Sequence, residues 1–232
     1  MPGNICIIPA RGGSKRIPRK NIKEFLGKPI LAYSIEAAIA TGIFDRIIVS
    51  TDDLEISKIA EKYGAEVPFL RTEENSNDYA TTMDVIKEVC GQLNQQEEVY
   101  DIICCLYPCA PFVKANKLVE AFDLMNSSGF ESVLPIIAFS YPIQRALKVN
   151  NGKVDFLNPK YLTARSQDLD KSYHDSGQFY FFKSAVLQNG NLFTNNTGCI
   201  IIDEKEGQDI DTLDDWTLAE IKYEYLQSFK AE

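Results

Sequence analysis

The chain has 232 residues, of which 45% are hydrophobic and 25% charged, as in an ordinary soluble globular protein. A formal net charge of −9 argues against general nucleic-acid binding, which needs a basic face. No apolar run reaches the roughly 18 residues that a membrane-spanning helix needs, and the first apolar stretch is too short for a signal peptide. We therefore expect a single domain over residues 1–232, in the cytoplasm, with no membrane and no nucleic-acid partner.

Strand-like and helix-like segments alternate along the chain. Apolar runs predict strands at residues 4–9, 46–51, 101–108, 130–139, 177–183 and 198–203. Amphipathic segments predict helices at residues 27–42, 53–64, 78–93, 114–129 and 213–229. This alternation predicts an α/β fold with a mostly parallel sheet and helices on both faces. The ligand of such a sheet lies at the carboxyl ends of the strands.

Residues 139–177 break the alternation. Their Pro and Asn-Gly turns predict short strands and loops, with a hairpin over residues 146–157 around Asn151 and Gly152. We interpret this segment as a small insertion that forms either a lid or an arm for dimerisation.

A basic cluster, "IPARGGSKRIPRKN", follows the first predicted strand at residues 8–21. Gly12 and Gly13 let backbone N–H groups approach an anion and form a concave nest. Six cations can neutralise a triphosphate: Arg11, Lys15, Arg16, Arg19, Lys20 and Lys23. The spacing matches neither the P-loop nor the GxGxxG fingerprint, and Asp52 lies too far along the chain for a dinucleotide site. The cluster therefore predicts a polyphosphate site and argues against a dehydrogenase.

A second polar stretch, "QDIDTLDDW", opens the last predicted helix. Thr212 and Asp215 have the spacing of a capping box. Asp209 and Asp211 precede the cap in extended chain, so their side chains point the same way, about 7 Å apart. Two carboxylates this close favour a shared cation, and Mg²⁺ or Mn²⁺ suits oxygen ligands that it shares with phosphates.

Several motifs together are similar to the cytidylyltransferases that activate sialic-acid-like sugars. Residues 8–22 resemble that family's opening signature, a strand followed by Ala-Arg-x-x-Ser-Lys and a basic Lys-Asn. The resemblance continues through "RIIVSTDD", "VPFLR", "DYATT", "LYPCAPF" and "QDIDT", and so covers essentially the whole chain. "FSYPIQRALK", "RSQDL" and "YHDSGQFYF" are most similar to the family's pseudaminic acid branch.

The resemblance implies a Rossmann-like nucleotidyltransferase fold and attack of a sugar hydroxyl on the α-phosphate of CTP, with pyrophosphate as the leaving group. It implies that Arg11, Ser14 and Lys15 hold the triphosphate and that Arg71 and Thr82 contact the cytidine end. The remaining nucleotide-binding candidates are Ala10, Gly12, Gly13, Lys20 and Asn21. Arg11, Lys15 and Asp211 are the catalytic candidates, and Asp209 and Asp211 are the metal ligands. Without the resemblance, Arg71 would be read as a surface residue.

Fewer sequence motifs indicate the residues that bind the sugar acid. The turn in "LYPCAPF" reads Gln-Pro-Thr-Ser-Pro in many relatives, and the substitutions Tyr107, Cys109 and Ala110 indicate a different sugar. Arginines pair well with a sugar carboxylate, although a surface or interface role is the alternative for those in the insertion. The candidates are Tyr107, Gln144, Arg145, Arg165 and Gln178. The only histidine, His174, and Asp175 are candidates for the group that accepts the hydroxyl proton.

We therefore expect an enzyme that uses CTP and a nine-carbon 2-keto sugar acid, pseudaminic acid first, and that forms a homodimer as its relatives do. Legionaminic acid, N-acetylneuraminic acid and Kdo are the alternative substrates. A pyrophosphorylase for another nucleotide and a non-catalytic nucleotide-binding module are the alternative functions. The six cysteines have no CxxC spacing, and we expect buried thiols in a reducing compartment.

Overall fold

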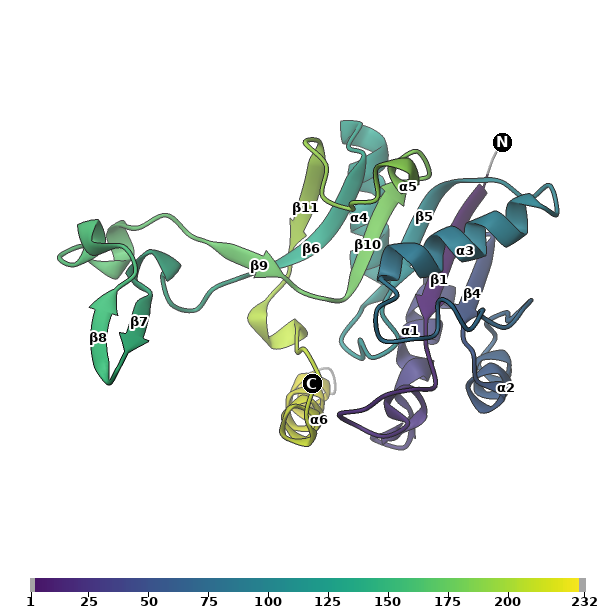
Figure 1. Cartoon of the computed structure of the whole chain (residues 1–232), viewed down its shortest axis with the longest axis horizontal. Coiled ribbons are helices and arrows are strands. Elements are labelled where there is room, and N and C mark those ends of the chain that lie inside the picture. The colour runs from purple at the N-terminus through teal and green to yellow at the C-terminus, as the bar shows by residue number, and fades with distance from the viewer. Residues whose placement is uncertain (1–2, 230–232) are drawn as a thin grey trace.

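The computed structural model describes residues 3–229 and contains one central mixed sheet (Figure 1). Its strand order is β11-β6-β10-β5-β1-β4, with β9 paired to β6. The strands are β1 (Gly3–Pro9), β4 (Arg46–Ser50), β5 (Tyr100–Leu106), β6 (Ser132–Ala138), β9 (Tyr173–Asp175), β10 (Phe179–Lys183) and β11 (Thr197–Ile201). β4, β1, β5, β6 and β11 run in one direction, and β10 and β9 run against them. The prediction of a mostly parallel α/β sheet is confirmed.

Helices cover both faces of this sheet, as predicted. They are α1 (Ile30–Thr41), α2 (Leu54–Lys62), α3 (Thr82–Asn94), α4 (Ala115–Ser128), α5 (Val186–Asn189) and α6 (Leu213–Ser228). The side chains of β1 alternate between two cores: Cys6 and Ile8 pack with α1, α2 and α4, while Ile5 and Ile7 pack with α3 and α5. None of the helices within residues 3–229 is long and apolar enough to cross a bilayer.

Short elements complete the chain. They are the strands β2 (Glu24–Phe25) and β3 (Lys28–Pro29) and the 3₁₀ helices Lys20–Ile22, Ile143–Arg145, Pro159–Tyr161, Ser166–Asp168 and Glu204–Glu206. All six cysteines lie in the described part of the chain and are free thiols. Cys6, Cys104 and Cys105 are buried as expected, whereas Cys199 is exposed, which corrects the expectation for that residue.

Two capping boxes set the helix starts that matter for the site. In α6, Thr212 and Asp215 form the predicted box. In α3, Thr81 is the N-cap and forms a box with Asp84, so the helix begins at Thr82 and not at residue 78 as predicted. Residues 78–81 are therefore loop, which leaves Asp78 free to turn back toward the first strand.

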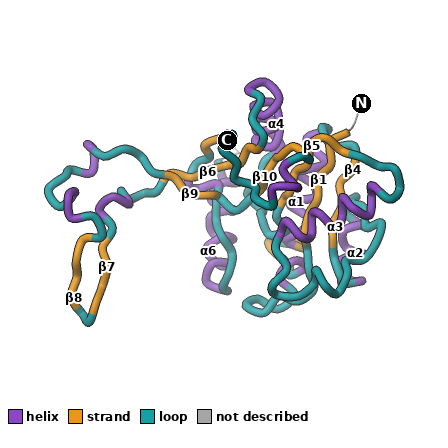
Figure 2. Tube along the Cα trace, turned by 45° about the horizontal axis from the view of Figure 1, so that its top comes forward, coloured by secondary structure: helices purple, strands orange, loops and turns teal. Residues whose placement is uncertain are grey.

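The insertion forms an arm, which we define as residues 139–172. Its hairpin pairs β7 (Leu147–Asn150) with β8 (Lys153–Phe156), and positive φ angles of 49° at Asn151 and 76° at Gly152 fit the predicted tight turn. Figure 1 and Figure 2 both show the arm extending away from the sheet. Apolar side chains on it are exposed, among them Leu147, Val149, Val154, Leu157 and Leu162.

Candidate active site

A cleft of four adjoining pockets lies at the carboxyl ends of β1, β5 and β6. The first, which we call the basic pocket, has a volume of about 380 Å³ and is lined by Arg11, Ser14, Lys15, Arg16, Lys20 and Asn21, among others. The second, the Arg71 pocket, has about 220 Å³ and is lined by Arg71, Asn77, Asp78, Thr81, Thr82 and Tyr107, among others. Arg11 and Pro9 line both of these pockets, so the two pockets are adjacent.

Two further pockets continue the cleft toward β6 and α6. The inner pocket, of about 120 Å³, includes Lys20, Asn21, Tyr107, Cys109, Gln178 and Asp209 in its lining. The outer pocket, of about 390 Å³, includes Tyr107, His174, Asp175, Ser176, Asp209 and Lys222. Tyr107 lines three of the four pockets and so stands at the junction of the cleft.

The start of the basic loop is held by hydrogen bonds to its backbone. The Gly12 N–H donates to Asp52 Oδ1 at 2.8 Å, and Asn21 Nδ2 donates to the Arg11 carbonyl at 2.8 Å. A Cβ atom on Gly12 would lie 2.8 Å from Asp53 Oδ2, so a larger residue there would force the Asp53 side chain to move. The Gly12 N–H is thus bonded to the Asp52 carboxylate, and the predicted contact between this N–H and a bound anion stays a prediction.

Asp78 binds the two cations that the sequence singled out as catalytic. Arg11 Nη1 donates to Asp78 Oδ1 at 2.8 Å and to the Asn77 carbonyl at 3.1 Å, and Lys15 Nζ donates to Asp78 Oδ2. The hydrogen bonds from Lys15 and then Arg11 lower the pKa of Asp78. Sequence reasoning missed Asp78 because it assigned the residue to a helix.

The other cations of the loop divide into two groups. Arg16 forms a salt bridge of 2.7 Å with Asp211, and Lys20 Nζ lies 3.8 Å from the same carboxylate. Arg19 instead pairs with Asp53 and with Glu55, outside the cleft. Its hydrogen bond is the main reason that the pKa of Asp53 is lowered to about 2. Arg19 therefore anchors the loop to α2, which corrects its reading as a phosphate ligand.

Arg71 is buried, with 7% of its surface exposed, so the alternative reading of a surface residue is wrong. Its Nε donates to Ser50 Oγ at 3.1 Å and its Nη2 donates to the Ser50 carbonyl, both at the end of β4. Burial is the main cause of a lowered pKa for this guanidinium. In the same pocket, the hydroxyl oxygens of Thr82 and Tyr107 are 3.4 Å apart. The structure thus brings together Arg71 and Thr82, as the predicted cytidine contacts require.

Asp211 contacts two cations that line the basic pocket, Arg16 and Lys20, and Asp209 stands two residues before it in the chain. Asp209 lines the inner and outer pockets, while Asp211 already binds a positive charge, the Arg16 guanidinium. Within residues 3–229, no group of three or more His, Cys, Asp or Glu side chains is arranged to hold a metal ion alone. A Mg²⁺ ion at these two carboxylates would complete its shell with water and substrate oxygens, as this ion commonly does. The donor chemistry therefore fits Mg²⁺.

The predicted sugar contacts fall in two places. Tyr107 and Gln178 meet in the inner pocket, where the Tyr107 N–H donates to the Gln178 carbonyl at 2.9 Å. Gln144, Arg145 and Arg165 lie in the arm and line none of the four pockets. Arg165 pairs with Asp168 at 2.8 Å. The single chain therefore does not bring the arm residues to its own cleft.

The two proton-acceptor candidates lie side by side in the outer pocket. Asp175 Oδ1 accepts the Gly177 N–H at 2.8 Å, and the Tyr180 hydroxyl donates to Oδ2. The His174 ring packs against Phe139 with ring centroids 4.9 Å apart. Asp175 is thus held in one orientation by two donors.

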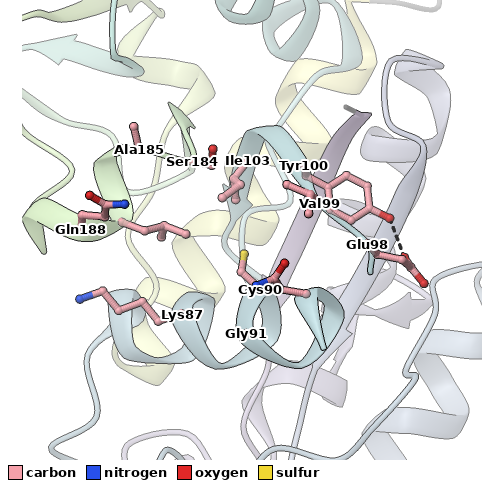
Figure 3. Close-up of a pocket in the computed structure, with 12 residues that line it drawn as sticks. Lys87, Cys90, Gly91, Glu98, Val99, Tyr100, Ile103, Ser184, Ala185 and Gln188 are labelled. Carbon is pink, nitrogen blue, oxygen red and sulfur yellow. Dashed lines mark hydrogen bonds between the residues drawn. The ribbon is translucent and has the colours of Figure 1, made fainter. Parts of the chain in front are cut away.

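A separate pocket of about 480 Å³ lies at the other end of β5. Its lining comes from α3, from the start of β5 and from residues 184–188, and includes Lys87, Cys90, Tyr100 and Ser184 (Figure 3). Burial raises the pKa of Cys90 to about 12, so this thiol is not activated. None of the predicted site residues lines this pocket.

Comparisons with known proteins identify the family of this chain. A family model described as Cytidylyltransferase matches residues 5–215. A pseudaminic acid cytidylyltransferase from Campylobacter jejuni subsp. jejuni serotype O:23/36 (strain 81-176) is 45% identical over 222 residues, which cover 95% of this chain and 96% of the relative. A CMP-N,N'-diacetyllegionaminic acid synthase from Legionella pneumophila subsp. pneumophila (strain Philadelphia 1) is 29% identical over 224 residues, 93% of this chain and 94% of the relative.

Among solved structures, CMP:2-keto-3-deoxy-manno-octonic acid synthetase complexed with CTP has the same fold. It matches 97% of this chain and 99% of its own, with a TM-score of 0.70 at 18% sequence identity. The predicted Rossmann-like nucleotidyltransferase fold is confirmed. With a family model over residues 5–215 and a relative 45% identical along nearly its whole length, this chain belongs to the cytidylyltransferase family.

Proposed function

We propose that the protein transfers CMP from CTP to pseudaminic acid and releases pyrophosphate. The observation that carries this proposal is the cleft itself, where Arg11 and Lys15 of the basic loop and Arg71 of a distant segment line adjoining pockets. The relative that is 45% identical is a pseudaminic acid cytidylyltransferase, which favours this sugar acid over legionaminic acid, N-acetylneuraminic acid or Kdo.

The basic pocket would bind the triphosphate. Arg11 and Lys15 would exchange the Asp78 carboxylate for phosphate oxygens, a swap of one anion for another that keeps both cations neutralised. Ser14 lines the same pocket and supplies a hydroxyl donor. Cations held in place before the reaction stabilise the charge that develops on the α-phosphate and on the leaving pyrophosphate.

Asp209 and Asp211 would hold Mg²⁺ or Mn²⁺ beside the cations of the basic pocket. When bound, the metal supplies positive charge that makes the α-phosphorus more open to attack. Asp211 would release Arg16 as it takes up the metal, and Arg16, which lines the basic pocket, would then be available to phosphate. Tyr107 and Gln178 border the inner pocket and would orient the sugar acid there.

The position of the remaining predicted sugar contacts supports a homodimer. Gln144, Arg145 and Arg165 lie on an arm that extends away from its own sheet (Figure 2) and carries exposed apolar side chains. Gln144 Oε1 and Arg145 Nε are buried and have no hydrogen-bond partner among the described residues. We propose that the arm of one protomer lies beside the cleft of its partner, where these residues would reach the sugar. The free cysteines of the described chain are consistent with the cytoplasm.

The test is pyrophosphate release with each of four nucleotides, CTP, UTP, ATP and GTP, against pseudaminic, legionaminic and N-acetylneuraminic acids and Kdo. We expect rapid release only with CTP and pseudaminic acid, and a CMP-sugar detected by mass spectrometry. A preference for another acid would overturn the substrate. Tight CTP binding without release for any acid would establish the non-catalytic module instead.

A further inference from the structure

The side-chain amide of Asn21 is fixed between two partners. Its Nδ2 donates to the Arg11 carbonyl at 2.8 Å, and its Oδ1 accepts from Cys109 Sγ at 3.1 Å. Asn21 is only 7% exposed, so water offers little substitute for either bond. Turning the amide over would place two carbonyl oxygens against each other at the Arg11 side, so the pair of bonds selects one orientation.

Asn21 acts on a particular peptide group. The Arg11 carbonyl and the Gly12 N–H belong to the same planar peptide unit. Asn21 holds the carbonyl end and Asp52 Oδ1 holds the N–H end, each at 2.8 Å. The peptide between Arg11 and Gly12 is therefore held from both sides, by Asn21 of the same loop and by Asp52 of a distant segment.

Cys109 completes this arrangement from a third segment, the turn after β5. The Cys109 thiol is a hydrogen-bond donor, as a threonine hydroxyl would be. Burial raises the pKa of Cys109 to about 12, so the thiol keeps its proton at neutral pH. Cysteine at this position thus preserves a donor toward Asn21.

We propose that Cys109 is a positioning residue for nucleotide binding: its thiol orients the Asn21 amide, which holds the Arg11–Gly12 peptide and so aims Arg11 into the basic pocket. Cys109 need not touch the nucleotide for this role. The proposal rests on the proposed function only in taking CTP as the ligand of the basic pocket, on which Cys109, a residue of the inner pocket, would act through Asn21.

The experiment compares two variants of nearly equal shape, Cys109→Thr with a hydroxyl donor and Cys109→Val without one. The dissociation constant of CTP is measured by calorimetry, and KM values are measured for CTP and for the sugar acid. We expect Cys109→Val to weaken CTP binding roughly tenfold, since the buried Asn21 oxygen loses its donor. Cys109→Thr should recover most of the loss.

A double-mutant cycle separates an effect of Cys109 through Asn21 from an effect of Cys109 on packing. In an Asn21→Ala background, Cys109→Thr and Cys109→Val should bind CTP equally, because the group they orient is gone. Cys90→Val, at the separate pocket beyond β5, is the control and should leave CTP binding unchanged. If the valine variant does not fold, Cys109→Ser and Cys109→Ala provide the same comparison.

The outcomes are distinct. Equal CTP affinity for Cys109→Thr and Cys109→Val would overturn the positioning role while the proposed function stands. A threonine–valine difference that persists in the Asn21→Ala background would overturn the route through Asn21. CTP binding without turnover in the wild type would reject the proposed function but leave the calorimetric comparison valid, and a wild type that does not bind CTP would reject both.

Discussion

Arg16 and Asp211 form a salt bridge of 2.7 Å that joins the basic loop to the segment before α6. The two residues are far apart in the sequence, and each comes from a motif that sequence reasoning treated separately. The cation expected at the phosphates thus neutralises the carboxylate expected at the metal.

The role of Asp211 can be tested by removing its charge. Asp211→Asn keeps the shape of the side chain but removes its charge, which weakens both metal binding and the salt bridge with Arg16. Turnover should therefore fall by orders of magnitude. Stability should change by less than about 1 kcal/mol, because the Arg16 partner is largely exposed. Activity assays and thermal unfolding of the two proteins provide the measurement.

Asp214→Asn is the matched control for that substitution. Asp214 lies in the first turn of α6, where its charge favours the helix dipole, so its loss should cost a few tenths of a kcal/mol and little activity. EDTA should abolish the activity of the wild type, and added Mg²⁺ or Mn²⁺ should restore that activity. Equal losses in the two variants, or full activity in EDTA, would contradict the metal assignment.

Arg11 and Lys15 are expected to matter mainly in the transition state. Arg11→Ala and Lys15→Ala should each lower kcat by orders of magnitude while the proteins stay folded, since each removes one charge-assisted contact to the triphosphate. Arg19→Ala removes a cation that pairs with Asp53 at the start of α2. It should instead lower the unfolding temperature and leave kcat nearly unchanged. Near-normal turnover in both Arg11→Ala and Lys15→Ala would show that the triphosphate binds elsewhere.

Asp78 is expected to compete with the nucleotide for the same two cations. Asp78→Asn should tighten CTP binding a few-fold at low ionic strength, because the triphosphate no longer has to displace a carboxylate. Glu73→Gln removes an equal charge from the same loop, and the Glu73 carboxylate has no salt bridge within residues 3–229, so it should change binding less. Weaker CTP binding in Asp78→Asn would mean that Asp78 supports the bound loop.

The Arg19–Asp53 pair predicts a pH dependence of stability. Asp53 has a pKa of about 2 in the folded protein, below its ordinary value of 3.8, chiefly because of the Arg19 hydrogen bond. Its folded pKa is depressed, so its contribution to the free energy of unfolding is complete above the ordinary value and is lost as the pH falls toward about 2. Urea unfolding over this range should show the difference between wild type and Asp53→Asn shrinking with acid.

Asparagine is the appropriate replacement because it also caps helices, so α2 keeps its N-cap at residue 53. Asp123→Asn on α4 is the control, since the Asp123 carboxylate has no salt bridge in the described part of the chain. A difference for Asp53→Asn that stays constant down to about pH 2 would show that the ion pair contributes nothing.

A substitution of Arg165 tests whether the arm contributes to binding of the sugar acid. Arg165→Ala should raise the KM of the sugar acid and leave the KM of CTP nearly unchanged, since a guanidinium that pairs with Asp168 in the free arm is suited to the sugar carboxylate. Lys160→Ala removes another cation of the arm and should have a smaller effect. Light scattering should give twice the monomer mass. An unchanged sugar KM argues against the contact, and a monomer at micromolar concentration argues against the dimer.

Local patterns in the sequence determined the elements and much of the candidate site. Alternating apolar runs placed the strands, because a strand buried on both faces needs apolar side chains on both. The turn at Asn151 and Gly152 and the cap at Thr212 were predicted from neighbouring residues alone, since turns and caps depend on interactions over two to four positions. The basic loop was recognised as a site because its charges and glycines are consecutive.

Tertiary structure alone decided which residues meet. β10 lies antiparallel between β5 and β6, which brings the Gln178 carbonyl to Tyr107, and no local signal specifies that strand order. Asp52, Asp78 and Cys109 reach the basic loop from three other segments, through bonds to Gly12, to Arg11 and to Asn21. Such contacts arise because parallel strands from distant parts of the chain end at one edge of the sheet, and only packing sets which strands are neighbours.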